Sequence, residues 1–234
     1  MQTLFDTFPF VRIINLRERT DRRRGTEREL ARIGVPIDGD RVAFHTADRF
    51  ADADGFPTIG ARGSFTSHLA CLQQAKAAGA SSVLIVEDDI AFHPPEDAIL
   101  TRILKDLGEN AWDVVYFGYL EPEVPDAAPG LHTYGGPTLG GQFYAVQEPY
   151  LSTMIAFMES CLTRPPGSPE GGPMFRDGAY NFYRQHHSAL RQMLCVPNLA
   201  TQRRSRTDLH ALKWFDRMPG VRLLANQGRR ILGR

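Results

Sequence analysis

The chain has 234 residues, of which 42% are hydrophobic and 23% charged, a composition typical of a globular protein and sufficient for one large α/β domain. Its 27 Lys and Arg residues balance 27 Asp and Glu residues, so the net charge gives no indication of nucleic-acid binding. Three widely spaced cysteines favour buried, reduced thiols over a disulfide framework or a zinc site.

The two ends of the chain bear on location. The amino terminus lacks a basic segment followed by a long apolar run, and no stretch approaches the about 18 apolar residues of a transmembrane helix. Residues 203–234 carry nine cations against two carboxylates, which suits contact with anionic lipid but is also typical of a solvated surface. We therefore expect a cytoplasmic protein with one domain over residues 1–210 and a basic helical tail over 211–234. Peripheral contact of that tail with the inner membrane face is the alternative to a solvated tail.

Predicted strands and helices alternate along the chain, which is typical of a mixed α/β sandwich with helices around a mostly parallel sheet. Two long connections, 119–137 and 163–173, are rich in Gly and Pro, and we expect the first to face a substrate. In chain order, the predicted elements are a strand at 11–16, a helix at 17–33, a strand at 41–46, a helix at 67–78, a strand at 83–86, a helix at 96–107, strands at 112–118 and 140–146, helices at 149–162 and 177–194, and an extended segment at 195–202.

The most informative stretch is an apolar run over residues 83–86 that leads directly into Glu87, Asp88 and Asp89. The run predicts a strand buried on both faces, so the acids belong at its carboxyl end, where open α/β sheets bind ligands. Adjacent acids repel one another unless a cation compensates them, and oxygen ligands suit Mg²⁺ or Mn²⁺. In an extended segment the first and third side chains share a side, which makes Glu87 and Asp89 the predicted metal pair and turns Asp88 to the other side. A solvated acidic turn is the alternative.

Cationic residues follow the first predicted strand at the same edge of the sheet. Arg19 and Arg22 carry planar guanidinium groups that can donate two parallel hydrogen bonds to a phosphate, although an Arg-rich helix surface is also commonly just solvated. A helix capped by Thr66 or Ser67 would place His68 in the first turn, near the positive end of the dipole. There His68 can order the metal loop or contact phosphate; a buried structural histidine is the alternative.

In order and spacing, these pieces resemble glycosyltransferase family 25, which includes bacterial lipooligosaccharide β-galactosyltransferases and collagen galactosyltransferases. The resemblance spans residues 11–208. It rests on Ile14-Asn15-Leu16 with Arg19 and Arg22, on Gly63 with Ser67-His68-Leu69, on the strand ending in Glu87-Asp88-Asp89, and on Trp112-Asp113, Gly141, Tyr144, Asp177, Gln202 and Ser205.

The resemblance implies a GT-A type, Rossmann-like nucleotide-binding fold and an inverting, Mn²⁺-dependent transfer (or Mg²⁺-dependent) from a UDP-sugar. UDP-galactose or UDP-glucose would be the donor. The acceptor would be a glycan, which could be linked to a lipid. The reaction would belong to the biosynthesis of lipopolysaccharide, lipooligosaccharide or another surface glycan. The family commonly has an acid where this chain has Ala61. The positions that the resemblance assigns to the nucleotide-sugar are Asn15, Arg19, Arg22, Ser67, His68, Asp88 and Gln142.

Inversion requires a base on the acceptor hydroxyl, and Asp177 is the predicted base because it follows a Gly- and Pro-rich loop that could close over substrate. A helix N-cap is the alternative role for Asp177. Gln142 and Tyr144 are expected to line the acceptor or sugar site, although an alternating strand could equally bury Tyr144. Further acids in the long loop are Glu121, Glu123 and Asp126.

Other functions stay open at this point. A protein, peptide or small-molecule acceptor suits these residues equally well, and an inactive module that binds a sugar nucleotide or glycan would keep the same fold. A dinucleotide oxidoreductase is disfavoured, because Arg17-Glu18-Arg19-Thr20 follows the first strand where a G-x-G-x-x-G motif would be required.

Overall fold

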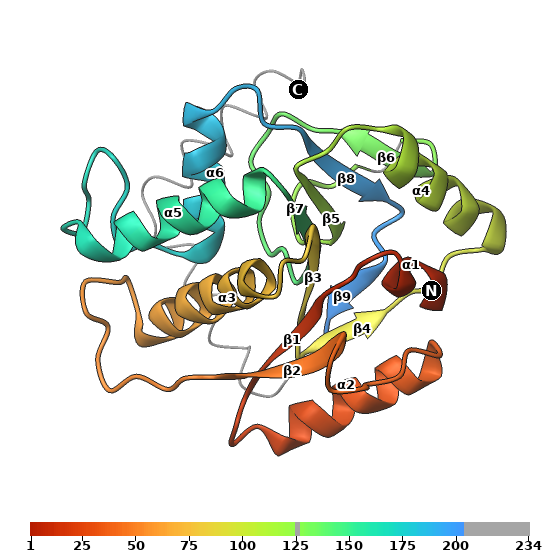
Figure 1. Cartoon of the computed structure of the whole chain (residues 1–234), viewed down its shortest axis with the longest axis horizontal. Helices are drawn as coiled ribbons and strands as arrows, with labels where there is room; N and C mark the ends of the chain where they lie inside the picture. Colours follow the sequence, from red (N-terminus) through yellow and green to blue (C-terminus); the bar gives the residue numbers. More distant parts are fainter. Residues whose placement is uncertain (125–126, 204–234) are drawn as a thin grey trace. The chain divides into compact units, whose positions relative to one another are not determined.

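The computed structural model describes residues 1–124 and 127–203. Its centre is a seven-stranded sheet with strand order β2-β1-β3-β7-β5-β8-β6 (Figure 1). Strands β7 and β6 run antiparallel to their neighbours and the other five run in one direction, which confirms the predicted Rossmann-like α/β class with a mostly parallel sheet. The strands are β1 Val11–Leu16, β2 Val42–Ala47, β3 Ser82–Glu87, β5 Val114–Gly118, β6 Gly130–Thr133, β7 Phe143–Gln147 and β8 Gln192–Val196.

Helices cover both faces of this sheet, so the core has two halves. Helices α1, α2 and α4 pack on one face and α3, α5 and α6 on the other. In β3, Leu84 and Val86 point into the first half while Val83 and Ile85 point into the second, and all four are fully buried. This explains the continuous apolar run, and each such side chain contributes about 1.5–3 kcal/mol by its burial. The helices are α1 Gln2–Asp6, α2 Thr20–Arg32, α3 Ile59–Ala77, α4 Asp97–Glu109, α5 Tyr150–Thr163 and α6 Arg176–His186.

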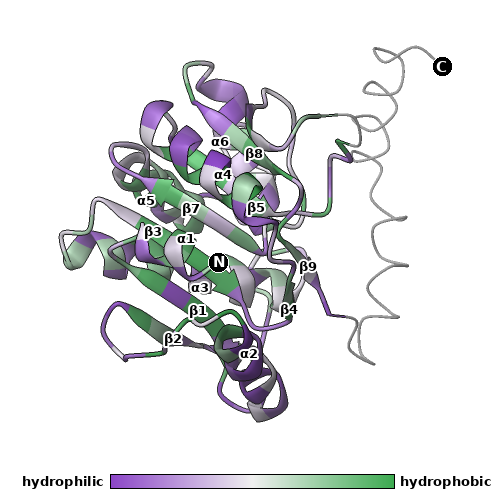
Figure 2. Ribbon diagram, turned by 90° about the vertical axis from the view of Figure 1, so that its right-hand side faces the viewer, coloured by the Kyte–Doolittle hydropathy of each residue, from purple (hydrophilic) through white to green (hydrophobic). Residues whose placement is uncertain are grey.

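Figure 2 shows the same layering by hydropathy, with hydrophobic strands in the middle and a strongly hydrophilic α2 on the outside. A second, two-stranded sheet pairs β4 (Ile90–Phe92) antiparallel with β9 (Ala200–Gln202). Because Ile90 pairs with Gln202, the last described strand lies beside the acidic turn. Three-residue strands are too short to be recognised from sequence periodicity.

Three expected element boundaries are wrong. Helix α3 begins at Ile59 rather than at Ser67, because the Thr58 hydroxyl caps it by accepting a hydrogen bond from the Ala61 N–H (2.9 Å). Helix α6 ends at His186, and the apolar residues predicted to extend it form β8 between β5 and β6. The loop expected over 119–137 contains edge strand β6. In the last two cases strand pairing with distant residues decides the outcome.

The described residues from Met1 to Gln202 form one compact unit. Within the described ranges, none of the helices combines the length and the apolar character needed to cross a bilayer. All three cysteines are buried, as predicted, and their thiols are free. The basic tail expected over residues 211–234 lies outside the described residues, as does Asp126.

Candidate functional site

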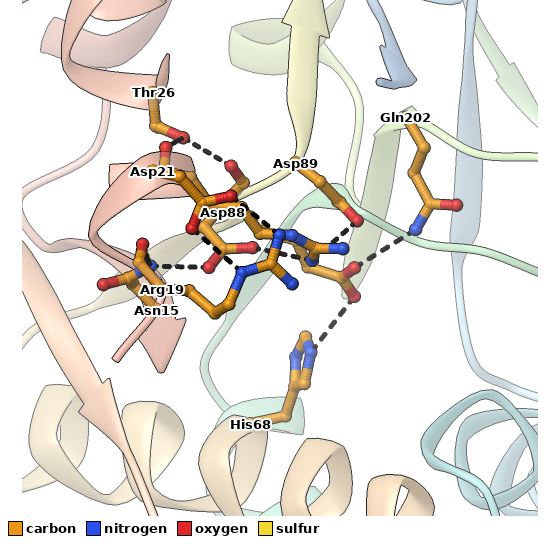
Figure 3. Close-up of polar contacts among 10 residues, drawn as sticks. Asn15, Arg19, Asp21, Thr26, His68, Asp88, Asp89 and Gln202 are labelled. Carbon is orange, nitrogen blue, oxygen red and sulfur yellow. Dashed lines mark hydrogen bonds and ion pairs between the residues drawn. The ribbon is translucent and has the colours of Figure 1, made fainter. Parts of the chain in front are cut away.

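The acidic residues lie where the sequence places them, at the carboxyl end of β3. Glu87 is the last residue of β3, and Asp88 and Asp89 form the turn that leads into β4 (Figure 3). The expectation of an extended segment through all three acids is therefore wrong. The turn changes which side chains meet: Asp88 and Asp89 share one arginine, while Glu87 contacts a different set of groups.

Asp88 is held by β1 and α2. The Asn15 side-chain amide donates to Asp88 Oδ2 at 2.6 Å, and the Thr26 hydroxyl donates to the Asp88 backbone carbonyl at 2.6 Å. Both residues precede Asp88 by more than 60 positions, so this fixation depends on the parallel pairing of β1 with β3. Asn15 therefore lies at the acidic cluster, and it orients Asp88.

Arg22, in the first turn of α2, bridges the two aspartates. Its Nη1 atom lies 3.2 Å from Asp88 Oδ1 and 3.1 Å from Asp89 Oδ2. Arg19, at the N-cap of α2, forms two hydrogen bonds of 3.0 and 2.9 Å with the exposed Asp21. The two arginines were predicted to act alike, but the structure gives Arg22 the contact with the acidic turn and gives Arg19 a contact on its own helix.

Glu87 contacts three donors at long distances. Arg176 Nη2, His68 Nε2 and Gln202 Nε2 each lie 3.4 Å from one of its carboxylate oxygens. Burial disfavours the charged carboxylate and raises the pKa of Glu87, and Arg176 opposes this shift only in part. Because none of the three contacts is short, the carboxylate has room to turn toward a ligand.

His68 lies in the third turn of α3, so its expected position at the helix start, near the positive dipole end, is wrong. Its ring is 1% exposed, and its Nδ1 shares a hydrogen bond of 2.7 Å with the Tyr144 hydroxyl, which in turn contacts the Tyr180 hydroxyl at 3.1 Å. Burial, reinforced by the Arg176 charge, lowers the pKa of His68 well below its usual value. A neutral imidazole thus links a buried tyrosine pair to Glu87.

Arg176 is the site residue that sequence reasoning missed. It is the first residue of α6, its side chain is 5% exposed, and it pairs with Glu87 and with Asp177 (Nη1 to Oδ1, 2.5 Å). Its guanidinium also lies over the rings of Tyr144 and Tyr180. A cation beside the predicted base was a visible signal, but its burial depends on the packing of α6 against α3 and α5, which the sequence does not show.

Asp177 lies in the first turn of α6, so the alternative of an N-cap is wrong; Phe175 occupies that position. Asp177 Oδ2 accepts a hydrogen bond from the Gly140 N–H at 2.8 Å, and Oδ1 pairs with Arg176. Both oxygens therefore have partners within the protein, which fixes the direction in which the carboxylate points.

Two further predicted site residues are buried. Gln142 is fully buried, its side-chain Nε2 donates to the Ala200 carbonyl at 3.1 Å, and its backbone carbonyl accepts from the Glu87 N–H at 2.9 Å. Tyr144 is also fully buried, so its alternative role in the core is the one observed. Both residues lie next to β3, the strand that ends in Glu87, and neither lines the neighbouring pocket.

A pocket of about 370 Å³ opens beside the acids. Its walls come from the carboxyl ends of β1 and β2 and from the amino-terminal half of α3, which combines apolar and polar groups in the manner of small-molecule sites. Ser67 lies there, with its hydroxyl donating to the Gly63 carbonyl at 2.7 Å. The lining residues are Ile14, Leu16, Arg22, Ala47, Asp48, Arg49, Phe50, Ile59, Gly60, Gly63, Ser64, Ser67, His68, Glu87 and Asp88.

The donor set suits a hard divalent cation only in part. In the described ranges, no three His, Cys, Asp or Glu side chains lie close enough together to form a complete metal site, and Arg22 and Arg176 lie among the acids. Carboxylate oxygens are nevertheless the ligands that Mg²⁺ and Mn²⁺ prefer. Four carboxylates against two guanidinium groups leave two negative charges in excess, which one divalent cation would neutralise. The carboxylates are those of Glu87, Asp88, Asp89 and Asp177.

Comparison with known proteins gave matches among solved structures alone. No family model and no curated protein matches the chain. A glycosyltransferase involved in the glycosylation of the major capsid of PBCV-1 is 14% identical, with a TM-score of 0.49 over 81% of this chain and 83% of that one. Drosophila β1,4-galactosyltransferase 7 in complex with manganese, UDP-Gal and xylobiose is 12% identical, with a TM-score of 0.41 over 86% and 72%. CTP:phosphocholine cytidylyltransferase of Streptococcus pneumoniae is 11% identical, with a TM-score of 0.43 over 88% and 98%. These neighbours are transferases.

Proposed function

We propose that this protein is a GT-A type glycosyltransferase of the family 25 kind, which moves galactose or glucose from a UDP-sugar to a glycan acceptor with inversion and with the help of Mn²⁺ or Mg²⁺. The observation that carries the proposal is the position of the acidic turn. The acidic turn lies at the carboxyl end of β3, and two of its carboxylates, those of Glu87 and Asp88, line a pocket of about 370 Å³ at the ends of β1 and β2. Ligands of open α/β sheets bind at this edge.

The pocket is suited to the nucleotide and the acids to the diphosphate. The lining combines apolar side chains such as Phe50 and Ile59 with charged ones such as Arg22 and Asp88. Glu87 and Asp89 would hold the divalent cation, which when bound neutralises charge on the leaving diphosphate. Asn15 holds the Asp88 carboxylate in place through its 2.6 Å hydrogen bond.

The transfer itself needs a proton acceptor. In the proposed reaction the acceptor hydroxyl oxygen bonds to the anomeric carbon, the bond from that carbon to the diphosphate oxygen breaks, and UDP leaves with the electron pair. Asp177 would take the hydroxyl proton. Arg176 and the Gly140 amide orient its carboxylate, which would have to turn from one of these partners to reach the hydroxyl.

The test is donor hydrolysis by the purified full chain. Each common UDP-sugar is incubated with Mn²⁺, and UDP release is compared among the wild type, Asp89→Ala and Asp97→Ala. Asp97 is an exposed carboxylate on α4 and serves as the matched control. We expect Mn²⁺-dependent release from one donor, retained in Asp97→Ala and lost in Asp89→Ala. The proposal is overturned if no donor is hydrolysed and calorimetry also shows no Mn²⁺-dependent binding of UDP.

A second function is favoured by the partners of Asp177. Because both of its oxygens already have protein partners, the same fold would also suit a module that binds a sugar nucleotide without turnover. Mn²⁺-dependent UDP binding without hydrolysis or transfer, across a panel of glycan, peptide and small-molecule acceptors, would favour that function.

A further inference from the structure

One guanidinium nitrogen lies between two carboxylates of the acidic turn. Arg22 Nη1 is 3.2 Å from Asp88 Oδ1 and 3.1 Å from Asp89 Oδ2, so one positive group serves two separate acids. The three side chains are 21%, 10% and 12% exposed, which weakens solvent screening of the charges. Arg22 therefore takes the bridging position that a bound cation would take between neighbouring carboxylates.

The acidic turn does not depend on Arg22 for its shape. Thr26 and Asn15 hold Asp88 through hydrogen bonds of 2.6 Å each, one to its backbone and one to its side chain. After the turn, β4 is paired with β9. The contribution that distinguishes Arg22 from these groups is its positive charge, and that charge is what a divalent cation can replace.

Arg22 also lines the pocket, and it has the chemistry for a second role there. Its side chain extends from the first turn of α2, and a guanidinium offers five N–H donors in a planar fork that matches phosphate oxygens. A guanidinium displaced from the acids would stay within the same pocket. It would then meet the negative charge of a diphosphate bound beside the cation.

We propose that Arg22 is an internal counter-cation, which a divalent cation held by Glu87 and Asp89 displaces from its shared contact with Asp88 and Asp89 and which then binds the diphosphate of the nucleotide. The proposal rests on the function proposed above and adds a coupling to it. Metal binding releases the phosphate-binding group, so metal and nucleotide each strengthen the binding of the other. Such coupling is reciprocal by thermodynamic necessity.

The experiment measures binding rather than turnover. Free Mn²⁺ is titrated into the full chain without nucleotide and followed by electron paramagnetic resonance, and UDP is titrated by calorimetry at saturating Mn²⁺. The variants are Arg22→Gln, Arg22→Lys and the control Arg23→Gln. Arg23 lies on the same helix, pairs with Glu27 and stacks on Phe44. Equal urea midpoints establish that the variants are folded.

We expect Arg22→Gln to bind Mn²⁺ roughly tenfold more tightly than the wild type and to bind UDP roughly tenfold more weakly. The exchange predicts that the substitution changes the affinities for Mn²⁺ and for UDP in opposite directions. Arg22→Lys, which keeps the charge, should bind Mn²⁺ like the wild type, and Arg23→Gln should change neither affinity. The exchange is overturned if Arg22→Gln weakens both ligands, leaves Mn²⁺ binding unchanged, or binds no Mn²⁺ at all. If the wild type still hydrolyses a UDP-sugar in that case, the proposed function stands without the exchange.

Discussion

The Tyr144 hydroxyl is the centre of a buried hydrogen-bonded chain, which makes Tyr144→Phe a sharp test of the packing behind the acids. The hydroxyl lies 2.7 Å from His68 Nδ1 and 3.1 Å from the Tyr180 hydroxyl, and all three residues are at most 3% exposed. Burial raises the pKa of Tyr144 well above its usual value, so the hydroxyl is neutral at physiological pH. The substitution removes one oxygen and keeps the ring.

The expected loss follows from what that oxygen contacts. Each hydrogen bond contributes about 1 kcal/mol, and a buried imidazole nitrogen left without a partner costs about 1–3 kcal/mol. Some of this cost overlaps, so we expect the free energy of unfolding to fall by about 2–4 kcal/mol. With a urea m-value of about 2 kcal/mol/M, the midpoint should move down by roughly 1–2 M. Circular dichroism and tryptophan fluorescence would follow the transition together.

Tyr116→Phe is the matched control. Tyr116 belongs to the same cluster, with its ring centroid 5.7 Å from that of Tyr144, and it is 2% exposed. Among the described residues its hydroxyl has no hydrogen-bond partner, so the control should change stability by no more than about 0.5 kcal/mol. If Tyr144→Phe is no more destabilised than this control, the chain from Tyr180 through His68 does not stabilise the site as argued.

Three further predictions concern the scaffold, each read from urea midpoints. Burial alone would raise the pKa of Asp113, but hydrogen bonds from Arg191 outweigh burial and lower that pKa. The pair therefore stabilises the fold at pH values above the unfolded-state pKa of about 4. This contribution to stability is lost as the pH falls through the folded-state pKa. Asp113→Asn should therefore be destabilised at pH 7, with the difference from wild type shrinking toward about pH 2; a pH-independent difference would contradict this. Thr58→Ala should cost about 1 kcal/mol, because it removes the cap of α3, and an unchanged midpoint would argue against that cap. Gly141→Ala should cost about 1–3 kcal/mol, since its Cβ would lie 2.6 Å from the Tyr116 ring; a neutral outcome would show that the ring can move.

The sequence predicts the frame of the site because the frame depends on local patterns. The apolar run that leads into Glu87 is buried on both faces, and short-range signals place Asn15 near the end of β1 and Arg22 after it. Parallel pairing of β1 with β3 then brings these positions to one edge. The strand order of the sheet thus brings residues that are far apart in the sequence close together in space.

What the sequence does not predict depends on distant contacts. Arg176 is buried only because α6 packs close to Glu87, 89 positions earlier in the chain. His68 was expected near a helix start because Thr66 or Ser67 could cap one, yet the Thr58 cap begins α3 nine residues before His68 and turns that side chain inward. The pairing of Asp88 with Asp89 through Arg22 follows from a turn that an apolar strand pattern does not reveal.

The pairing of β4 with β9 has a consequence for how the chain is made. The acidic turn leaves the ribosome early, but Gln202, which contacts Glu87 and pairs with Ile90, follows 115 positions after Glu87. Strand β8, which separates β5 from β6, also arrives late. A nascent chain thus leaves Glu87 without its Arg176 and Gln202 contacts, and leaves strand edges open, until nearly all of the sheet has been synthesised. A partly synthesised chain therefore lacks the complete candidate ligand site.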